Sequence, residues 1–287
     1  MLSYEQLASF HAPEVIARYT AKDVILYALA VGVGGELPAT TILPFVYEKE
    51  LCPLASFYNI IGWHDPSWLH GLKVDMSRLV HLSEQVDIMH PLIAQGEVVV
   101  SSRIGKVYDR GADKGLLVEA VTEVRNVGSA TVMARTSSTL LCMGDGGLEG
   151  APQAPKIPKN LHNVDIEAPT GTLQFQTRSD QAALYRLCGD LNPIHIDPVA
   201  AHGVGFDTPL LHGLCTLGIG LQTVSRAVSR VQQGGIQGFN GRFSAPVFPG
   251  EMLDIDYWDK GSKLLFQVRV GDRVAIKDGW VALSDAV

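Results

Sequence analysis

From Pro209 to Val231 the chain reads PLLHGLCTLGIGLQTVSRAVSRV, the most informative segment for the architecture. Its apolar residues recur every three or four positions, which predicts a long helix, and Pro209 suits a helix start. Those positions are Leu214, Leu217, Leu221, Val224, Val228 and Val231. The opening turns are apolar on nearly all sides, and glycines at 213, 218 and 220 indicate a close neighbour. An antiparallel sheet wrapped around a buried helix fits this pattern.

Strand patterns and internal repeats surround this helix. Residues 264–270 alternate between apolar and polar, as in a half-buried strand. LHGL occurs at Leu69–Leu72 and again at Leu211–Leu214. DVILYALAVG from Asp23 resembles DQAALYRLCG from Asp180, and VYDRGADKGLLVEAVTEV resembles DYWDKGSKLLFQVRV. The repeat order predicts a duplicated α+β unit. We expect domains at residues 1–147 and 164–287, joined by a proline-rich linker at residues 148–163.

The first copy departs from the second after its LHGL. There the chain reads LKVDMSRLVHLSEQVDIMHPL, which indicates loop and strand instead of an apolar helix. We therefore expect the central helix of the first half to be reduced or lost. Its sheet would then enclose a space that could hold a long apolar ligand.

Composition narrows the class of protein. The chain has 287 residues, 46% of them hydrophobic and 18% charged, enough for a sizeable core. A net charge of −7 without a dense basic run argues against nucleic-acid binding. The four cysteines are widely spaced, and neither a signal peptide nor a membrane span is visible. These features predict a soluble cytoplasmic protein.

Candidate chemistry lies in GDLNPIHID, residues 189–197. Asp190, Asn192 and His195 fall just past a predicted helix, and Pro193 prevents that helix from continuing. One interpretation is an Asx-turn that punctuates a helix end. The other is a general acid and a general base held around one water molecule. Gly213, near the start of the long helix, is either a close-packing glycine or an oxyanion donor.

Other site classes find little support. His195, Asp197, His202 and His212 cluster in the sequence, but their spacing matches no zinc signature, so we expect no metal. His202 and His212 are interpreted as packing or hydrogen-bonding residues. The glycine runs GVGGE and GDGGLEG lack the strand-turn-helix context of a dinucleotide site.

With YRLCGDLNPIHID, FDTPLLHGLCTLG and GRFSAPVFPGE, the chain resembles the MaoC-like (R)-specific enoyl-CoA hydratases. It is most similar to the hydratase 2 type, which carries two hot-dog domains in one chain. The resemblance implies reversible syn addition of water to a trans-2-enoyl-CoA, giving the (3R)-3-hydroxyacyl-CoA, in fatty-acid or steroid side-chain β-oxidation. It assigns the acid–base pair to Asp190 and His195, a supporting role to Asn192, and the oxyanion N–H to Gly213.

The resemblance also implies contacts to the acyl-CoA. These would be His70 and Gly71 at the first LHGL, Phe243 in GRFSAP, and either Arg110 or Lys114 for the CoA phosphates. It further implies a homodimer that needs no cofactor besides the CoA of the substrate. The alternatives are a hot-dog thioesterase and a non-catalytic acyl-CoA-binding subunit. The acyl group, the physiological direction and the choice of base between Asp190 and His195 stay open.

Overall fold

The computed structural model describes residues 3–34, 39–63, 66–155, 167–228 and 235–284. The first half contains short helices, 3-10 turns (η) and five strands: α1 (Tyr4–Ala8), β1 (Val15–Tyr19), α2 (Ala21–Ala30), α3 (Ala39–Val46), η1 (Ala55–Phe57), α4 (Tyr58–Gly62), η2 (Pro66–Leu72), η3 (Met76–Arg78), β2 (Leu79–Ile88), β3 (Gly96–Asp109), β4 (Leu116–Asn126) and β5 (Val132–Cys142). The second half contains β6 (Gly171–Gln176), α5 (Gln181–Tyr185), η4 (Arg186–Cys188), η5 (Pro193–His195), α6 (Pro198–Gly203), α7 (Gly213–Ala227), β7 (Ile236–Phe243), β8 (Met252–Asp259), β9 (Lys263–Val270) and β10 (Arg273–Leu283).

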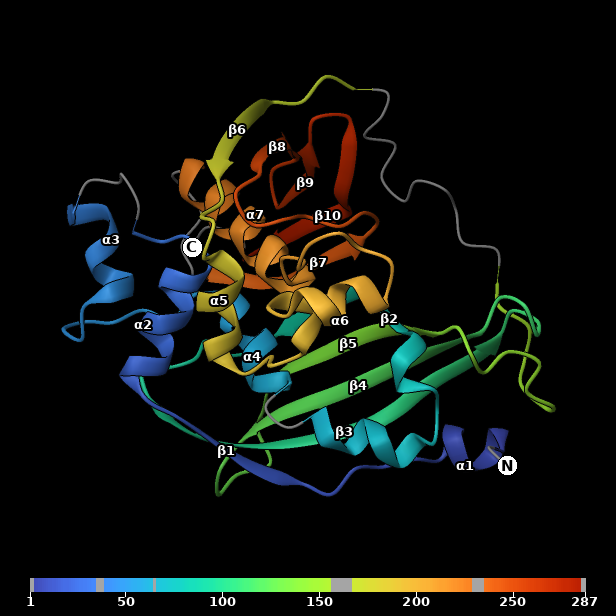
Figure 1. Ribbon diagram of the computed structural model, residues 1–287. Coiled ribbons are helices and arrows are strands. Elements are labelled where there is room, and N and C mark those ends of the chain that lie inside the picture. The colour runs from blue at the N-terminus through green and yellow to red at the C-terminus, as the bar shows by residue number, and fades with distance from the viewer. Residues whose placement is uncertain (1–2, 35–38, 64–65, 156–166, 229–234, 285–287) are drawn as a thin grey trace.

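Within the described residues, ten strands form one sheet in the order β1-β3-β4-β5-β2-β7-β10-β9-β8-β6. Every pairing is antiparallel. Each half contributes five consecutive strands, and the two halves meet where β2 pairs with β7 (Figure 1). Counted outward from this junction, both halves repeat the same order of strands. The sequence repeats therefore correspond to a structural repeat, and the predicted α+β double hot-dog architecture is confirmed.

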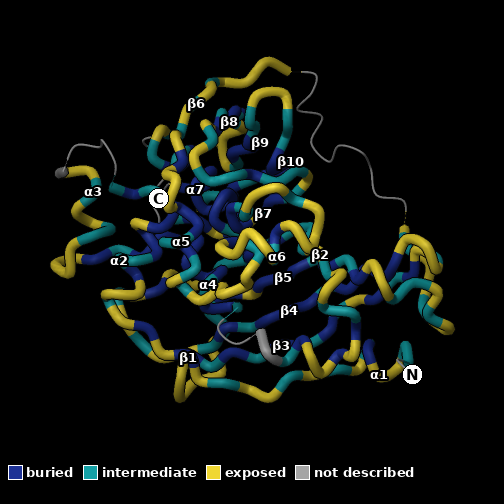
Figure 2. Tube along the Cα trace, in the orientation of Figure 1, coloured by how far each residue is buried: buried dark blue, intermediate teal, exposed yellow. Residues whose placement is uncertain are grey.

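In the second half the strands wrap α7, whose middle turns are buried (Figure 2). A Cβ atom at Gly218 would lie 2.7 Å from Cγ1 of Val31, so this glycine permits close packing against the end of α2. The helix begins at Gly213, not at Pro209 as expected. Residues 210 and 211 are instead held outside it, because their N–H groups donate to the carbonyls of Ile194 and Val247.

The first half has no counterpart to α7 among its described residues, as predicted. In its place the short helix α4 packs on β4 and β5, and η1 packs against α4. Phe57, Tyr58 and Ile61 from this segment are buried in the core. The expected space for a long apolar ligand in this half stays a prediction.

The two halves also meet away from the sheet. Gln181 of α5 donates its amide to the carbonyl of Ala30 at the end of α2, and the Cys215 thiol reaches the same oxygen. Of the expected linker at residues 148–163, the part up to residue 155 is described and bonds to Asp109 of β3. Residues 156–163 lie outside the described part. All four cysteines are unpaired. No helix in the described ranges has the length and apolarity to cross a membrane.

Candidate active site

The loop between α5 and α6 is shaped by its own side chains. Gly189 ends η4 with a φ of 138°, a conformation that favours glycine. The carboxylate of Asp190 accepts the N–H of Asn192 at 3.1 Å, and the side-chain oxygen of Asn192 accepts the N–H of Ile194 at 3.2 Å. Asn192 thereby caps η5, the single turn that carries His195. The Asx-turn interpretation is thus correct, and the same turns present the acidic and imidazole side chains together.

His195 has a defined tautomer. Its Nδ1 lies 2.9 Å from the carbonyl oxygen of Leu210, which can only accept a hydrogen bond. Nδ1 therefore carries the proton in the neutral ring, and Nε2 keeps its lone pair. The residue is only 9% exposed. Burial lowers its pKa, although the charge of Asp190 and the bond to Leu210 act in the opposite direction.

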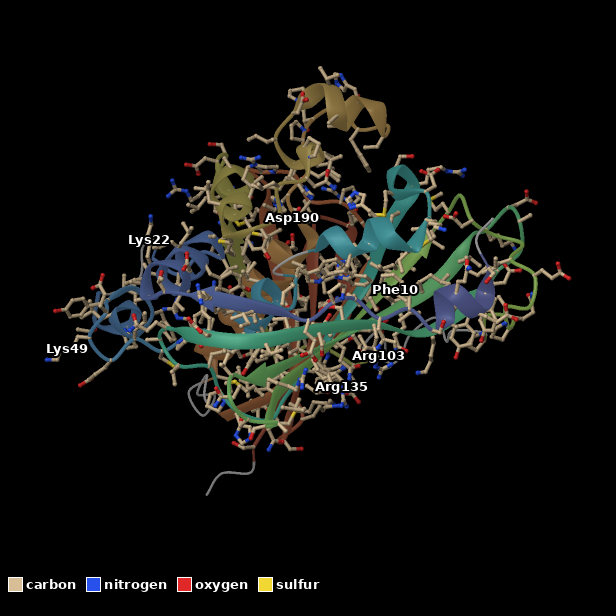
Figure 3. The ribbon with its side chains drawn as sticks, turned by 90° about the horizontal axis from the view of Figure 1, so that it is seen from below. Phe10, Lys22, Lys49, Arg103, Arg135 and Asp190 are labelled. Carbon is tan, nitrogen blue, oxygen red and sulfur yellow. The ribbon has the colours of Figure 1, made fainter. Side chains whose placement is uncertain are left out.

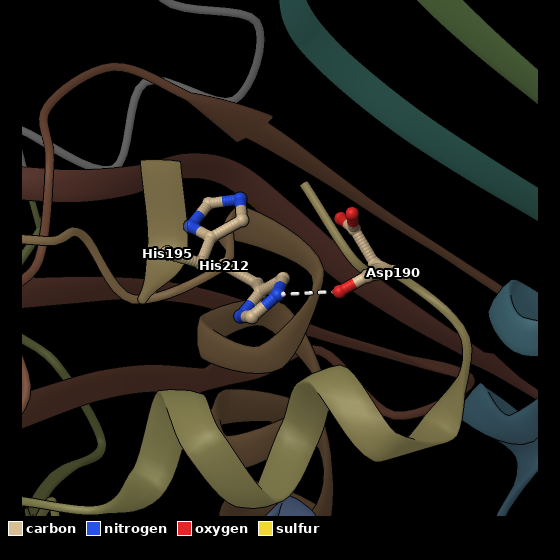
Figure 4. Close-up of side chains that lie close together, drawn as sticks. All are labelled: Asp190, His195 and His212. Carbon is tan, nitrogen blue, oxygen red and sulfur yellow. Dashed lines mark hydrogen bonds between the residues drawn. The ribbon is translucent and has the colours of Figure 1, made fainter. Parts of the chain in front are cut away.

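Asp190 and His195 lie close enough to share one small molecule (Figure 4). A carboxylate oxygen of Asp190 and one ring nitrogen each of His195 and His212 all lie within 4.8 Å of one another. Two hydrogen bonds of ~2.8 Å that meet at a tetrahedral water span ~4.6 Å. Asp190 is exposed to solvent, and its label lies near the centre of the view in Figure 3. A water held between the acid and the base is therefore compatible with the geometry.

Gly213 supplies an open backbone donor beside this pair. It is the first residue of α7 and is exposed, and His212, which precedes it, makes no side-chain cap. Among the described residues, none accepts the Gly213 N–H. The first N–H groups of a helix carry partial positive charge, so this group can stabilise a developing oxyanion. A Cβ atom here would lie 3.0 Å from Cδ1 of Phe243, so close packing and an open N–H both apply.

His212 completes the cluster and is the packing and hydrogen-bonding residue that the sequence predicted. Its ring stacks on that of His195 with centroids 3.7 Å apart and planes 26° from parallel. Ring lone pairs lie in the ring planes, so two rings stacked in this way do not converge on one ion ~2 Å from both nitrogens. The group Asp190–His195–His212 is therefore better suited to proton transfer than to metal ligation.

Comparison with known proteins identifies the family. The model of the MFE-2 hydratase 2 N-terminal domain matches residues 18–144, and that of the MaoC-like domain matches residues 162–280. The chain is 30% identical to "Enoyl-CoA hydratase 2, peroxisomal" of Arabidopsis thaliana, covering 93% of this chain and 90% of the relative. It is 32% identical to "3-hydroxyacyl-thioester dehydratase Y" of Mycobacterium tuberculosis, covering 93% of each. The chain belongs to the MaoC-like hydratase 2 family. Its structure also superposes on that of a MaoC-like dehydratase from Phytophthora capsici with a TM-score of 0.79, at 27% identity over 98% of both chains.

In this family member the first half reaches the site through β2. The ring of His81 meets that of Phe243 edge-on at 4.9 Å, and the ring of Trp63 lies 5.5 Å from His81. The buried carboxylate of Glu84 and the carbonyl of Ser83 both lie within hydrogen-bond distance of Nε2 of His81. Sequence reasoning missed His81, although its signal was visible as a histidine and a glutamate in the strand pattern LVHLSEQV.

The other predicted binding residues lie on different elements. His70 and Gly71 belong to η2, where a Cβ atom at Gly71 would lie 3.2 Å from the ring of Phe10. Arg110 and Lys114 are exposed in the turn between β3 and β4. No described contact links these four residues to His195 or to Gly213. Their contacts to an acyl-CoA stay predictions.

Proposed function

We propose that the protein is an (R)-specific enoyl-CoA hydratase that adds water to trans-2-enoyl-CoA and forms (3R)-3-hydroxyacyl-CoA in β-oxidation. The relatives named above support this activity, since one is named as a hydratase and the other as a dehydratase. The observation that carries the proposal is the placement of Asp190 and His195 within 4.8 Å, beside the open N–H of Gly213. One acid–base pair and one oxyanion donor are what hydration of an unsaturated thioester requires.

The mechanism follows from the orientation of these groups. Nε2 of His195 has a free lone pair and accepts a proton as the water oxygen attacks Cβ. The pair His195 and Asp190 then returns one proton to Cα on the same face, so that the product gains one complete water molecule. Meanwhile the Gly213 N–H accommodates the charge that develops on the thioester oxygen. Asn192 supports the reaction by fixing the loop through its cap of η5.

The proposal also assigns substrate binding and catalysis to different halves of the chain. The second half carries the chemistry, and the first half contributes to the binding of the acyl chain and CoA. Phe243 lines the oxyanion side, while His70, Gly71 and either Arg110 or Lys114 contact the CoA. No group other than the CoA of the substrate is needed, because the proton transfers use side chains already in place.

The test is the hydration of trans-2-enoyl-CoA, followed by loss of enoyl absorbance and chiral analysis of the product. Asp190→Asn and His195→Gln should each lower kcat by a factor of ~10² to 10⁴. Asp197→Asn is the matched control, because its side chain caps α6 in the same loop and asparagine retains that cap. Full activity of Asp190→Asn with intact folding, or release of free CoA without hydration, would refute the proposal.

We also propose a cytoplasmic homodimer. Four unpaired cysteines support a reducing compartment, and the resemblance to hydratase 2 enzymes supports the dimer. The names of some relatives contain the word peroxisomal. Imaging of the tagged native chain tests the compartment, and light scattering during gel filtration tests the dimer. A peroxisomal signal or a monomeric mass would contradict the respective part.

A further inference from the structure

One buried histidine contacts each part of the candidate site. Nε2 of His212 lies 3.1 Å from the backbone carbonyl of Asp190, the contact drawn as a dashed line in Figure 4. Its ring stacks on His195 at 3.7 Å. The next residue in the chain is Gly213, the proposed oxyanion donor. His212 therefore joins three groups that come from two separate segments of the chain.

The ring of His212 is uncharged at neutral pH. A carbonyl oxygen only accepts hydrogen bonds, so Nε2 must carry the proton, and Nδ1 is buried without a partner in the described chain. Burial is the largest cause that lowers its pKa to about 4, followed by the charge of His195. Arg186 also lowers it, while the charge and the carbonyl of Asp190 raise it. The ring of Tyr185, 4.8 Å away, provides a further contact.

Neutrality matters because His195 must change its charge during the reaction. A permanent positive charge on a ring stacked 3.7 Å away would oppose that change. The flat, neutral ring of His212 instead restricts the orientation of the His195 ring. The pKa of His195 is then set by its burial and by the charge of Asp190. The hydrogen bond from Nε2 of His212 to the backbone carbonyl of Asp190 restricts the position of Asp190 as well.

We propose that His212 is a positioning residue of the hydration reaction, whose uncharged ring keeps His195 and Asp190 in register with the N–H of Gly213. This inference rests on the proposed function. It assigns no direct contact with the substrate to His212. Displacement of a reacting group by about 1 Å can cost ~10²-fold in rate, so loss of this residue should lower kcat more than it raises KM.

Two substitutions separate the two contacts. His212→Phe retains a flat ring over His195 but removes the donor to the carbonyl of Asp190. His212→Gln retains a donor but removes the ring and admits water beside His195. Each should lower kcat ~10- to 100-fold with KM changed by less than ~3-fold. His202→Gln is the control, because this exposed histidine of α6 bonds the Asp207 carbonyl and should leave kcat unchanged.

The pH profile supplies a readout that a merely structural role would not move. In His212→Gln, water gains access to the ring of His195 and should raise the pKa of His195 toward its ordinary value. The acid limb of the kcat/KM profile should therefore shift to higher pH. In His212→Phe the ring of His195 stays buried, so the acid limb of the kcat/KM profile should stay at the wild-type pH. Wild-type kcat and an unshifted limb in both variants would overturn the inference, as would a change confined to KM.

Two further results keep the outcomes distinct. Histidine-ring ¹⁵N spectra of the wild-type protein should show His212 neutral and protonated at Nε2 at about pH 6, below the ordinary histidine pKa. A charged ring or the Nδ1–H tautomer would overturn the inference even if neither variant folds. If the wild type does not hydrate enoyl-CoA, the proposed function fails. If it does, and Asp190→Asn is inactive while both His212 variants match the wild type, only this inference fails.

Discussion

The buried state of His212 makes a quantitative prediction about stability in acid. Its pKa is about 4 in the folded protein, against 6.5 for an exposed histidine. Above pH 6.5 neither state binds this proton, so the site has no effect there. As the pH falls below 6.5 the unfolded chain takes up the proton first, and folding stability is lost until the pH reaches about 4. At about pH 4.5 the loss is on the order of 2 kcal/mol, a sizeable part of the ~5–15 kcal/mol typical of native proteins.

The assay is urea unfolding near pH 7.5 and near pH 4.5, followed by tryptophan fluorescence and by circular dichroism to check that the transitions coincide. His212→Gln removes the titrating group. Its free energy of unfolding should be below that of the wild type at the higher pH, and the difference should shrink by a margin on the order of 2 kcal/mol at the lower pH. His202→Gln should follow the wild type at both values. A constant difference between wild type and His212→Gln would contradict this prediction, because it would mean that the buried ring binds its proton as readily as in the unfolded chain.

Three further outcomes follow from the site and from the helix that carries it. Gly213→Ala should lower kcat about 10- to 100-fold in the hydration assay while changing the melting temperature little, because its Cβ, 3.0 Å from Phe243, displaces the ring beside the oxyanion donor. Gly218→Ala should instead cost about 1–3 kcal/mol in urea unfolding, because its Cβ would lie 2.7 Å from Val31 in the core. In the wild-type enzyme, kcat/KM should fall in acid with a midpoint below pH 6.5. Burial lowers the pKa of His195, and protonation removes the lone pair that accepts the proton from water. A midpoint above pH 6.5 would contradict this prediction.

Local patterns were sufficient for much of the fold. The three-and-four spacing along α7 predicts its buried face, and the repeats predict the matching order of strands in the two halves. The helix start was mispredicted because Pro209 is compatible with a first turn, whereas tertiary bonds from residues 210 and 211 to Ile194 and Val247 hold the chain extended. Such bonds join segments distant in sequence, so no local pattern contains them.

The sequence predicted the loop residues from local patterns, Gly213 from its place near the start of a helix, and Phe243 from the family resemblance. Asp190, Asn192 and His195 lie within one loop, and the turns that orient them are local. His81 was missed because it reaches Phe243 through the pairing of β2 with β7, a contact between the two halves. An irregularity in β2 between His81 and Ser83 also interrupts the alternation that would have marked the inward face.

The two LHGL segments show why duplication need not give two sites. In the second half, the glycine begins a 15-residue helix, so its N–H lies at the positive end of an extended dipole and stays open. In the first half, Gly71 lies within a 3-10 segment packed against Phe10, and no comparable helix follows among the described residues. The same tetrapeptide therefore has different structural surroundings in the two places. What distinguishes them is the helix that follows, since its aligned peptide groups add positive potential at the Gly213 N–H.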